Sequence, residues 1–269
     1  MRIVQNLHLP PQAAAPFNGG MLDYGQFCTV ARGAEVLGER WTLLVVRELL
    51  CGSTHFNELR RGLPRMSTTL LAARLRTLEE FGVVRRRVSG RATSYELTAA
   101  GESLRPIVMA IGHWGAEWIG SRLEPGHLDV GFLMWDVRRF LRLDRVPPDR
   151  RVVVLFQFVD AREREQDWWL VVQAGRAELC RDDPGHDLTL VVESNVRALT
   201  EVWTGDRLPE EVLQSREVRV MGASRDAEAF WDWLGTSAFA PSRRLALSRP
   251  LPATPAPGAR GPAASSTRP

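Results

Sequence analysis

Ser67-Thr-Thr-Leu-Leu-Ala-Ala-Arg-Leu-Arg-Thr-Leu-Glu-Glu-Phe-Gly82 is the stretch that decides the fold of the first half of the chain. Ser67 is a favourable N-cap, Gly82 is a favourable terminator, and leucines recur at positions 71, 75 and 78. This spacing of apolar residues predicts a helix of about four turns with one buried face.

The opposite face of the predicted helix carries Thr69, Ala73, Arg76 and Thr77. Short side chains in the first turns allow close approach to another surface, and one long cation follows them. A recognition helix that enters the major groove of DNA by its N-terminal end needs this arrangement. An ordinary solvated face would carry the same residues, so the helix alone leaves both interpretations open.

The flanking sequence favours DNA binding. Two short helical patterns precede the stretch, at residues 41–50 and 55–63, with Trp41 and Leu44 expected in the core, and the turn at 62–66 completes a helix-turn-helix. Two predicted strands follow, at 83–88 and 93–97. Three helices and a basic hairpin predict a winged helix, whose wing would place arginines on phosphates. These wing arginines are Arg85, Arg86, Arg87 and Arg91.

Several motifs in this region resemble one known family. They are Cys28-Thr-Val30, Leu37-Gly-Glu-Arg-Trp-Thr-Leu-Leu44, Arg47-Glu-Leu-Leu50, Phe56-Asn-Glu-Leu59, Leu75-Arg-Thr-Leu-Glu-Glu-Phe-Gly-Val83, Tyr95-Glu-Leu-Thr98 and Gly101-Glu-Ser-Leu104. Together they resemble the HxlR family of bacterial winged-helix regulators over about residues 24–120.

The resemblance implies a homodimer that binds pseudo-palindromic promoter DNA. The DNA contacts are expected at Ser67, Thr68, Thr69, Ala73, Arg76, Thr77, Arg85, Arg87 and Arg91. Thr29, Thr69 and Ala73 depart from the residues that family members usually carry, and the wing is shorter than usual. These departures affect the operator sequence that is expected, not the DNA-binding role.

A long helix is predicted from Ala99 to about Gly120, with Pro106 bending it without ending it. Its apolar stripe is larger than a small domain needs for its own core. We expect the stripe to pack against a second copy of the chain, which would hold two recognition helices about one DNA turn, ~34 Å, apart. The stripe consists of Leu104, Val108, Ile111, Gly115 and Trp118.

Charge divides the chain. Residues 28–122 hold 14 arginines and 9 glutamates, a net charge of +5, whereas residues 123–240 hold 15 arginines and 22 acidic residues, a net charge of −7. An acidic domain would be repelled by DNA phosphates. We therefore expect recognition and dimerisation to reside in the first half. The sequence shows neither a membrane-spanning run nor a secretory signal, so a cytoplasmic location is expected.

The second half reads as an α+β domain: a helix from Val130, strands at 152–159, 168–173, 176–180 and 188–193 forming a four-stranded meander, a helix from Asn195, a strand at 219–222 and a helix at 226–234. Its element order resembles the sterol-carrier-protein-like fold over about residues 126–236. That resemblance implies an apolar tunnel for a small hydrophobic ligand. Candidate pocket residues are Trp135, Trp169, Trp203 and Trp231, although large aromatic residues also serve as plain core.

Two functions for this second domain remain open: a sensor of a small hydrophobic ligand, or a dimerisation or partner-docking module that senses nothing. No catalytic constellation, metal-ligand spacing or cofactor motif stands out, so neither an enzyme nor a cofactor is expected. Cys28 corresponds to a redox-sensing cysteine in some relatives of the family, and a plain structural thiol is the alternative. The predicted domains are a disordered leader at 1–23, the winged-helix domain at 24–122, the α+β domain at 126–236 and a disordered tail at 240–269.

Overall fold

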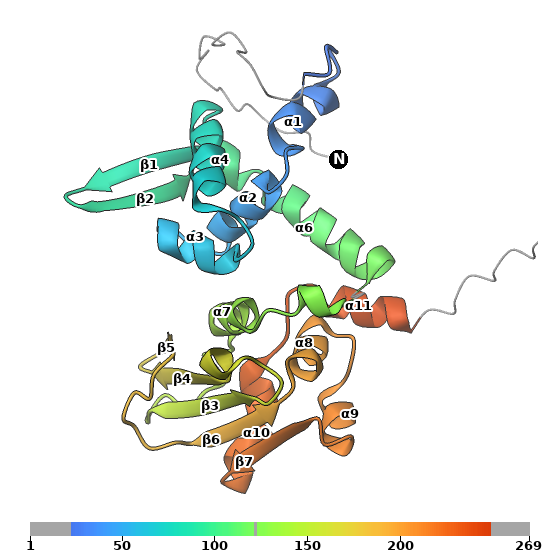
Figure 1. Ribbon diagram of the computed structural model, residues 1–269. Coiled ribbons are helices and arrows are strands. Elements are labelled where there is room, and N and C mark those ends of the chain that lie inside the picture. Colours follow the sequence, from blue (N-terminus) through green and yellow to red (C-terminus); the bar gives the residue numbers. More distant parts are fainter. Residues whose placement is uncertain (1–22, 121–122, 249–269) are drawn as a thin grey trace, which may run out of the picture.

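A computed structural model of the chain describes residues 23–120 and 123–248. Figure 1 shows the helices and strands in two groups, with the helix-turn-helix elements in one group and a larger sheet in the other. The first group begins with α1 (Thr29–Leu37), α2 (Thr42–Leu50), α3 (Phe56–Gly62), α4 (Thr68–Glu80), β1 (Val84–Ser89) and β2 (Ala92–Leu97). This order confirms the predicted helical fold with a β-hairpin wing. The predicted leader lies almost entirely outside the described residues.

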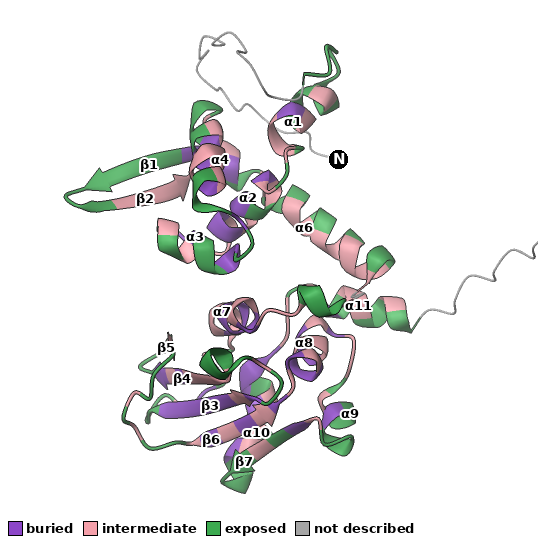
Figure 2. Cartoon of the chain, in the orientation of Figure 1, coloured by how far each residue is buried: buried purple, intermediate pink, exposed green. Residues whose placement is uncertain are grey.

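Helix α4 forms as its sequence predicts. The Ser67 hydroxyl accepts a hydrogen bond from the Leu70 amide at 3.2 Å, which satisfies one free donor at the helix N-terminus. Leu71, Leu75 and Leu78 are fully buried in a core shared with α2, α3 and β1. The opposite face of α4 therefore stays available for contact with a partner (Figure 2).

The wing is a two-stranded antiparallel hairpin in which Val84 pairs with Leu97 and Ser89 pairs with Ala92. It is fixed to the start of α3, because the Tyr95 amide donates to the Thr54 carbonyl at 2.8 Å. The wing consequently has a set position relative to α3 and α4.

The predicted helix from Ala99 to Gly120 is not continuous, and this part of the prediction is wrong. It is divided into α5 (Ala99–Glu102), α6 (Arg105–Trp114) and a π-helical turn, η1 (Gly115–Ile119). Pro106 lies in the first turn of α6, where its missing amide donor costs no helical hydrogen bond. The proline thus starts a new helix instead of bending an existing one.

The second group contains short turns η2 (Pro125–His127) and η3 (Glu163–Glu165) besides regular elements. The helices are α7 (Val130–Phe140), α8 (Val196–Thr204), α9 (Pro209–Gln214), α10 (Ser224–Leu234) and α11 (Ala240–Leu247). The strands are β3 (Val152–Phe158), β4 (Asp167–Gln173), β5 (Arg176–Cys180), β6 (Leu190–Ser194) and β7 (Val218–Gly222).

The strands form one mixed sheet in the order β5-β4-β3-β6-β7. An α+β architecture is therefore confirmed, but the predicted four-stranded meander is wrong. Strand β6 pairs in parallel with β3, with Phe156 opposite Val192, and does not extend the hairpin edge at β5. The central strand β3 is buried along almost its whole length, as expected for a strand with neighbours on both sides.

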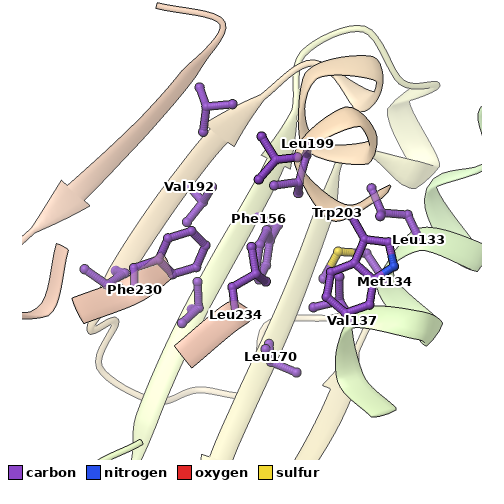
Figure 3. Packing of buried hydrophobic residues seen from close by; sticks show 14 of the residues in the cluster. Leu133, Met134, Val137, Phe156, Leu170, Val192, Leu199, Trp203, Phe230 and Leu234 are labelled. Atoms are coloured by element: carbon purple, nitrogen blue, oxygen red, sulfur yellow. The ribbon is translucent and has the colours of Figure 1, made fainter. Parts of the chain in front are cut away.

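The core of the second group lies between this sheet and its helices (Figure 3). Phe156 of β3 packs against Phe230 of α10, with 6.0 Å between the ring centroids. Met134 and Val137 of α7 and Leu199 and Trp203 of α8 belong to the same buried cluster. Helix α7 is thus anchored in this core while its other side is free to meet the first group.

Helix α11 corrects the predicted disordered tail for residues 240–247. Its start is held against α6: the Phe239 ring meets the His113 ring edge-on at 5.3 Å, and His113 Nδ1 lies 2.7 Å from Ser242 Oγ. Arg243 pairs with Asp206 at 2.5 Å. These contacts order a segment whose Pro-, Ala- and Arg-rich composition suggested a tail. The rest of the predicted tail, 249–269, lies outside the described residues.

Candidate nucleic-acid interface and interdomain seam

The predicted groove-facing residues lie on one exposed side of α4. Thr68, Thr69 and Arg76 are exposed, while Ala73 and Thr77 are half-buried. The Thr77 hydroxyl donates to the Ala73 carbonyl at 3.2 Å, so it is engaged within the helix. The short side chains and Arg76 therefore share a face, as the sequence predicts, and their contact with bases stays a prediction.

Two arginines on α4 have different environments. Arg74 pairs with Glu39 and donates to the Arg40 carbonyl, which ties α4 to the loop before α2. Arg76 has no ion pair within the described part of the chain, and its guanidinium extends from the exposed face. Arg76 is therefore the α4 arginine available to a DNA base.

The wing arginines are only partly available. Arg87 and Arg85 both donate to Glu96 Oε2, at 3.1 and 3.4 Å, across the hairpin. These hydrogen bonds, led by that from Arg87, lower the pKa of Glu96 below its usual value. Arg91 is exposed at the turn. A phosphate must compete with Glu96 for Arg85 and Arg87, but not for Arg91.

A buried ion-pair cluster joins the two groups of elements; we call it the seam cluster, and it consists of Arg47, Glu48, Asp136 and Arg139. Arg139 of α7 donates to Glu48 Oε2 of α2 at 2.7 Å and to Asp136 Oδ1 at 3.0 Å. Arg47 of α2 contacts Asp136 at 2.6 Å and Glu48 at 2.5 Å. Two cations and two anions therefore balance across the boundary between the groups.

The seam cluster is shielded from water. Glu48 is 0% exposed and Asp136 is 6% exposed, and the Trp203 indole donates to Asp136 Oδ2 at 3.0 Å. Burial acts to lower the pKa of Arg47, but the charges of Asp136, Cys51 and Glu48 and the hydrogen bond to Asp136 together outweigh it and raise that pKa. A Cβ at Gly62 would occupy the space of the Glu48 carboxylate, so glycine is required there. This cluster is not predicted from the sequence, although the charged residues within the apolar stripe of α2 are a signal for it.

Two cavities line the same boundary. The seam cavity, about 520 Å³, is lined by residues of both groups, among them Trp41, Leu44, Leu63, Val108, Phe132 and Phe239. The tryptophan cavity, about 500 Å³, is lined among others by Arg61, Trp135, Arg138, Trp168, Cys180 and Arg181. Pro64, Asp129 and Phe132 line both cavities, so the two are neighbours beside the α3–α4 turn and the start of α7.

The sequence predicts both Trp41 and Leu44 in the core, but only Trp41 packs against it, as a half-buried side chain. Leu44 is 49% exposed and Trp41 is half-buried, because both face the seam cavity. Trp41 also has a left-handed backbone, with φ of 79°, which is rare for a bulky residue.

The four tryptophans predicted to form a pocket are not brought together around one cavity. Trp135 lines the tryptophan cavity. Trp203 is buried in the core, and Trp231 packs against Phe230 with 5.0 Å between ring centroids. Trp169 lies on β4, opposite Leu155 and Cys180.

Cys28 is an exposed free thiol at the N-cap of α1, and its redox role stays a prediction. Burial raises the pKa of Cys51, which makes that thiol less reactive. Within residues 23–120 and 123–248, no cluster of His, Cys, Asp or Glu has the geometry of a metal site. Over the same ranges, no helix combines the length and apolar character needed to span a bilayer.

The fold and the exposed face of α4 define a winged helix-turn-helix DNA-binding regulator. Residues 36–122 match the family model described as HxlR-like helix-turn-helix. The uncharacterised HTH-type transcriptional regulator YvaP of Bacillus subtilis is 39% identical over 101 residues, which cover 36% of this chain and 90% of that relative. The regulator sll1512 of Synechocystis sp. is 34% identical over 98 residues, which cover 35% and 73% of the two chains. The chain belongs to the HxlR family.

Among solved structures, the redox regulator HypR in its reduced form is 33% identical, with 33% of this chain and 90% of that chain covered and a TM-score of 0.32. The matching relatives over the first half are transcriptional regulators, and the chain is a DNA-binding transcriptional regulator of the HxlR family. The family model ends at residue 122, so it assigns no family to the α+β region that follows.

Proposed function

We propose that the protein acts as a homodimer on a pseudo-palindromic operator, with α4 in the major groove and the wing on the phosphate backbone. The observation that carries this proposal is the exposed face of α4, where Arg76 has no ion-pair partner among the described residues and follows short side chains. The contact set is Ser67, Thr68, Thr69, Ala73, Arg76, Thr77, Arg85, Arg87 and Arg91.

Exposed apolar side chains support the dimer. On α6 and η1, Ile107, Ile111, Trp114 and Trp118 are between 46% and 68% exposed, and Val30 on α1 is 76% exposed. Exposed apolar side chains in this number are unfavourable in water, and exposed apolar surface of this kind often marks a protein interface. A second copy that packs on α1 and α6 would cover it and set the spacing of the two α4 helices.

The chain would divide into the winged-helix domain at 24–122 and a sterol-carrier-protein-like domain at 126–236, the latter sensing a small hydrophobic ligand. The order of helices and strands in the second domain supports the resemblance, and the apolar cavity beside α7 supports sensing. The alternative is a docking module. The dispersion of the four tryptophans favours that alternative.

A ligand screen separates the two functions. Small apolar compounds are titrated against the full chain, with tryptophan fluorescence as the first readout and DNA affinity as the second. Sensing predicts at least one compound that changes both the fluorescence and the DNA affinity, the latter about tenfold or more. If compounds that bind never change the DNA affinity, the docking module replaces the sensor.

A further inference from the structure

We infer that the seam cavity is the binding site for a compact, neutral, apolar molecule whose presence is transmitted to α4. This inference rests on the proposed function, in which the second domain senses such a ligand, but it moves the site from the interior of that domain to its boundary with the winged helix. The volume of about 520 Å³ lies within the range of roughly 300 to 1,000 Å³ that is usual for small-molecule pockets.

The chemistry of the wall selects an uncharged ligand. Leu63 is buried, and Val108, Phe132 and Phe239 supply further apolar surface. The charged groups that reach the wall from α2, Arg47 and Glu48, are already neutralised in the seam cluster. A ligand with its own charge would lose its hydration without gaining a free partner inside.

Two further charged groups in the lining, Asp129 and Arg65, do not change this selection. Asp129 is occupied as the N-cap of α7, accepting the Phe132 amide at 2.8 Å. Arg65 is exposed, so it remains in contact with water. An apolar ring system therefore matches the interior better than an acid or an amine does.

The geometry of α6 separates this cavity from the apolar surface assigned to the second copy. At about 100° per residue, Ile107, Trp114 and Trp118 lie on one stripe, while Val108 and Gly112 lie roughly a quarter turn or more away. Val108 and Gly112 line the seam cavity, and Ile111 borders both regions. The partner chain and the ligand thus use different faces of α6.

The position of the cavity provides a route to DNA. Its wall includes Leu63, Pro64 and Arg65, the turn that leads through Met66 to the N-cap Ser67 of α4. Its other wall is the first turn of α7, which belongs to the second domain. Trp41, in its left-handed backbone conformation, stands in the same wall, and such local strain is characteristic of functional sites. A ligand there would contact both domains at once.

The test uses the full chain and N-phenyl-1-naphthylamine, a neutral probe that fluoresces in apolar surroundings. Leu44→Trp places a larger side chain in the cavity, and Leu213→Trp is a matched control on α9, where the leucine is also partly exposed. We expect saturable binding of one probe per chain, at least tenfold weaker in Leu44→Trp and within twofold of wild type in Leu213→Trp. Equal binding by both variants, or no binding by wild type, would overturn the inference.

A second probe tests the chemical class. The sulfonated analogue 8-anilinonaphthalene-1-sulfonate has the same ring system and one negative charge. We expect it to bind at least tenfold more weakly than the neutral probe. Tighter binding of the sulfonate would contradict the neutral ligand class.

Hydrogen–deuterium exchange on the wild-type chain locates the probe even if Leu44→Trp fails to fold. The inference predicts slower exchange at residues 62–66 and 108–112. Protection confined to β3, β6 and α8 would place the ligand inside the second domain. That result would agree with the proposed sensing function and would contradict the seam cavity as the binding site. Sedimentation of Leu44→Trp completes the test. If Leu44→Trp loses the dimer and the wild-type chain does not bind the probe, the wall of the seam cavity is a contact with the second copy instead of a ligand site.

Discussion

Arg76 and Arg91 should contact DNA in different ways. Arg76 is exposed on α4 and forms no ion pair within residues 23–120 and 123–248, whereas Arg91 lies at the tip of the wing. Arg76→Ala should therefore cost about 1 to 3 kcal/mol on the preferred site and weaken the preference between bases. Arg91→Ala should weaken binding to all sequences alike and reduce the slope of log affinity against log salt by about one. Fluorescence anisotropy on preferred and scrambled duplexes measures both effects.

Arg74→Ala is the control for Arg76, because Arg74 is used within the protein. It should lower thermal stability without blurring base preference. If Arg74→Ala blurs the preference and Arg76→Ala does not, the wrong face of α4 has been assigned to the groove.

Glu96 restrains the wing. Its pKa is lowered, so its pairing with Arg87 and Arg85 is present above the ordinary carboxyl pKa and is lost only as the pH falls through the lowered folded value. At neutral pH a substitution is needed to release the arginines. Glu96→Gln should increase affinity for all DNA sequences and steepen the salt slope by about one.

Glu163→Gln makes the same charge change in the second domain, on an exposed turn. It should leave the salt slope unchanged. A titration of affinity against salt compares the two variants with wild type. Equal slopes for Glu96→Gln and wild type would mean that the wing does not contact phosphates.

At the scale of elements, the contact of α2 with α7 depends on Glu48. Glu48→Ala removes one buried anion and leaves Arg139 inadequately paired at the seam, which should cost about 3 to 5 kcal/mol of unfolding free energy. Glu102→Ala breaks an exposed pair with Arg105 and should cost less than about 1 kcal/mol. Urea denaturation measures both changes. Similar costs for the two variants would show that the seam cluster does not stabilise the fold.

Elements specified by nearby residues could be predicted from the sequence. The Ser67 cap and the leucines at 71, 75 and 78 define α4, and the turn at Gly90 defines the wing, because caps, periodicity and turns are local signals. The exposed side of α4, and with it Arg76, follows from the same pattern. Most of the candidate DNA-binding site could therefore be predicted without a structure.

Elements that depend on contacts between distant residues could not be predicted from the sequence. The parallel pairing of β6 with β3 depends on a crossover that no local pattern records. Helix α11 is ordered by contacts with His113 and Asp206, far away in the chain. The seam cluster also joins residues about 90 positions apart, so no local sequence pattern indicates that the two domains are in contact.

At the scale of the whole molecule, the two domains differ in net charge but are joined by a buried ion pair. The first domain carries the excess of arginine and the second an excess of acid, yet Arg139 of the acidic half is buried against Glu48 of the basic half. Long-range repulsion from phosphates would keep the second domain off DNA, while the seam holds it against the turn before α4. A change at the seam therefore has a short path to the DNA-binding surface.

The central claim is that two chains bind the operator as a dimer. Selection from a randomised DNA pool by the full chain tests this claim most directly, with sedimentation of the selected complex to give the number of chains bound. A dimer with two α4 helices predicts an inverted repeat whose half-sites lie about one turn, ~34 Å, apart, bound by two chains. Enrichment of a single half-site bound by one chain, or no enrichment at all, would contradict it.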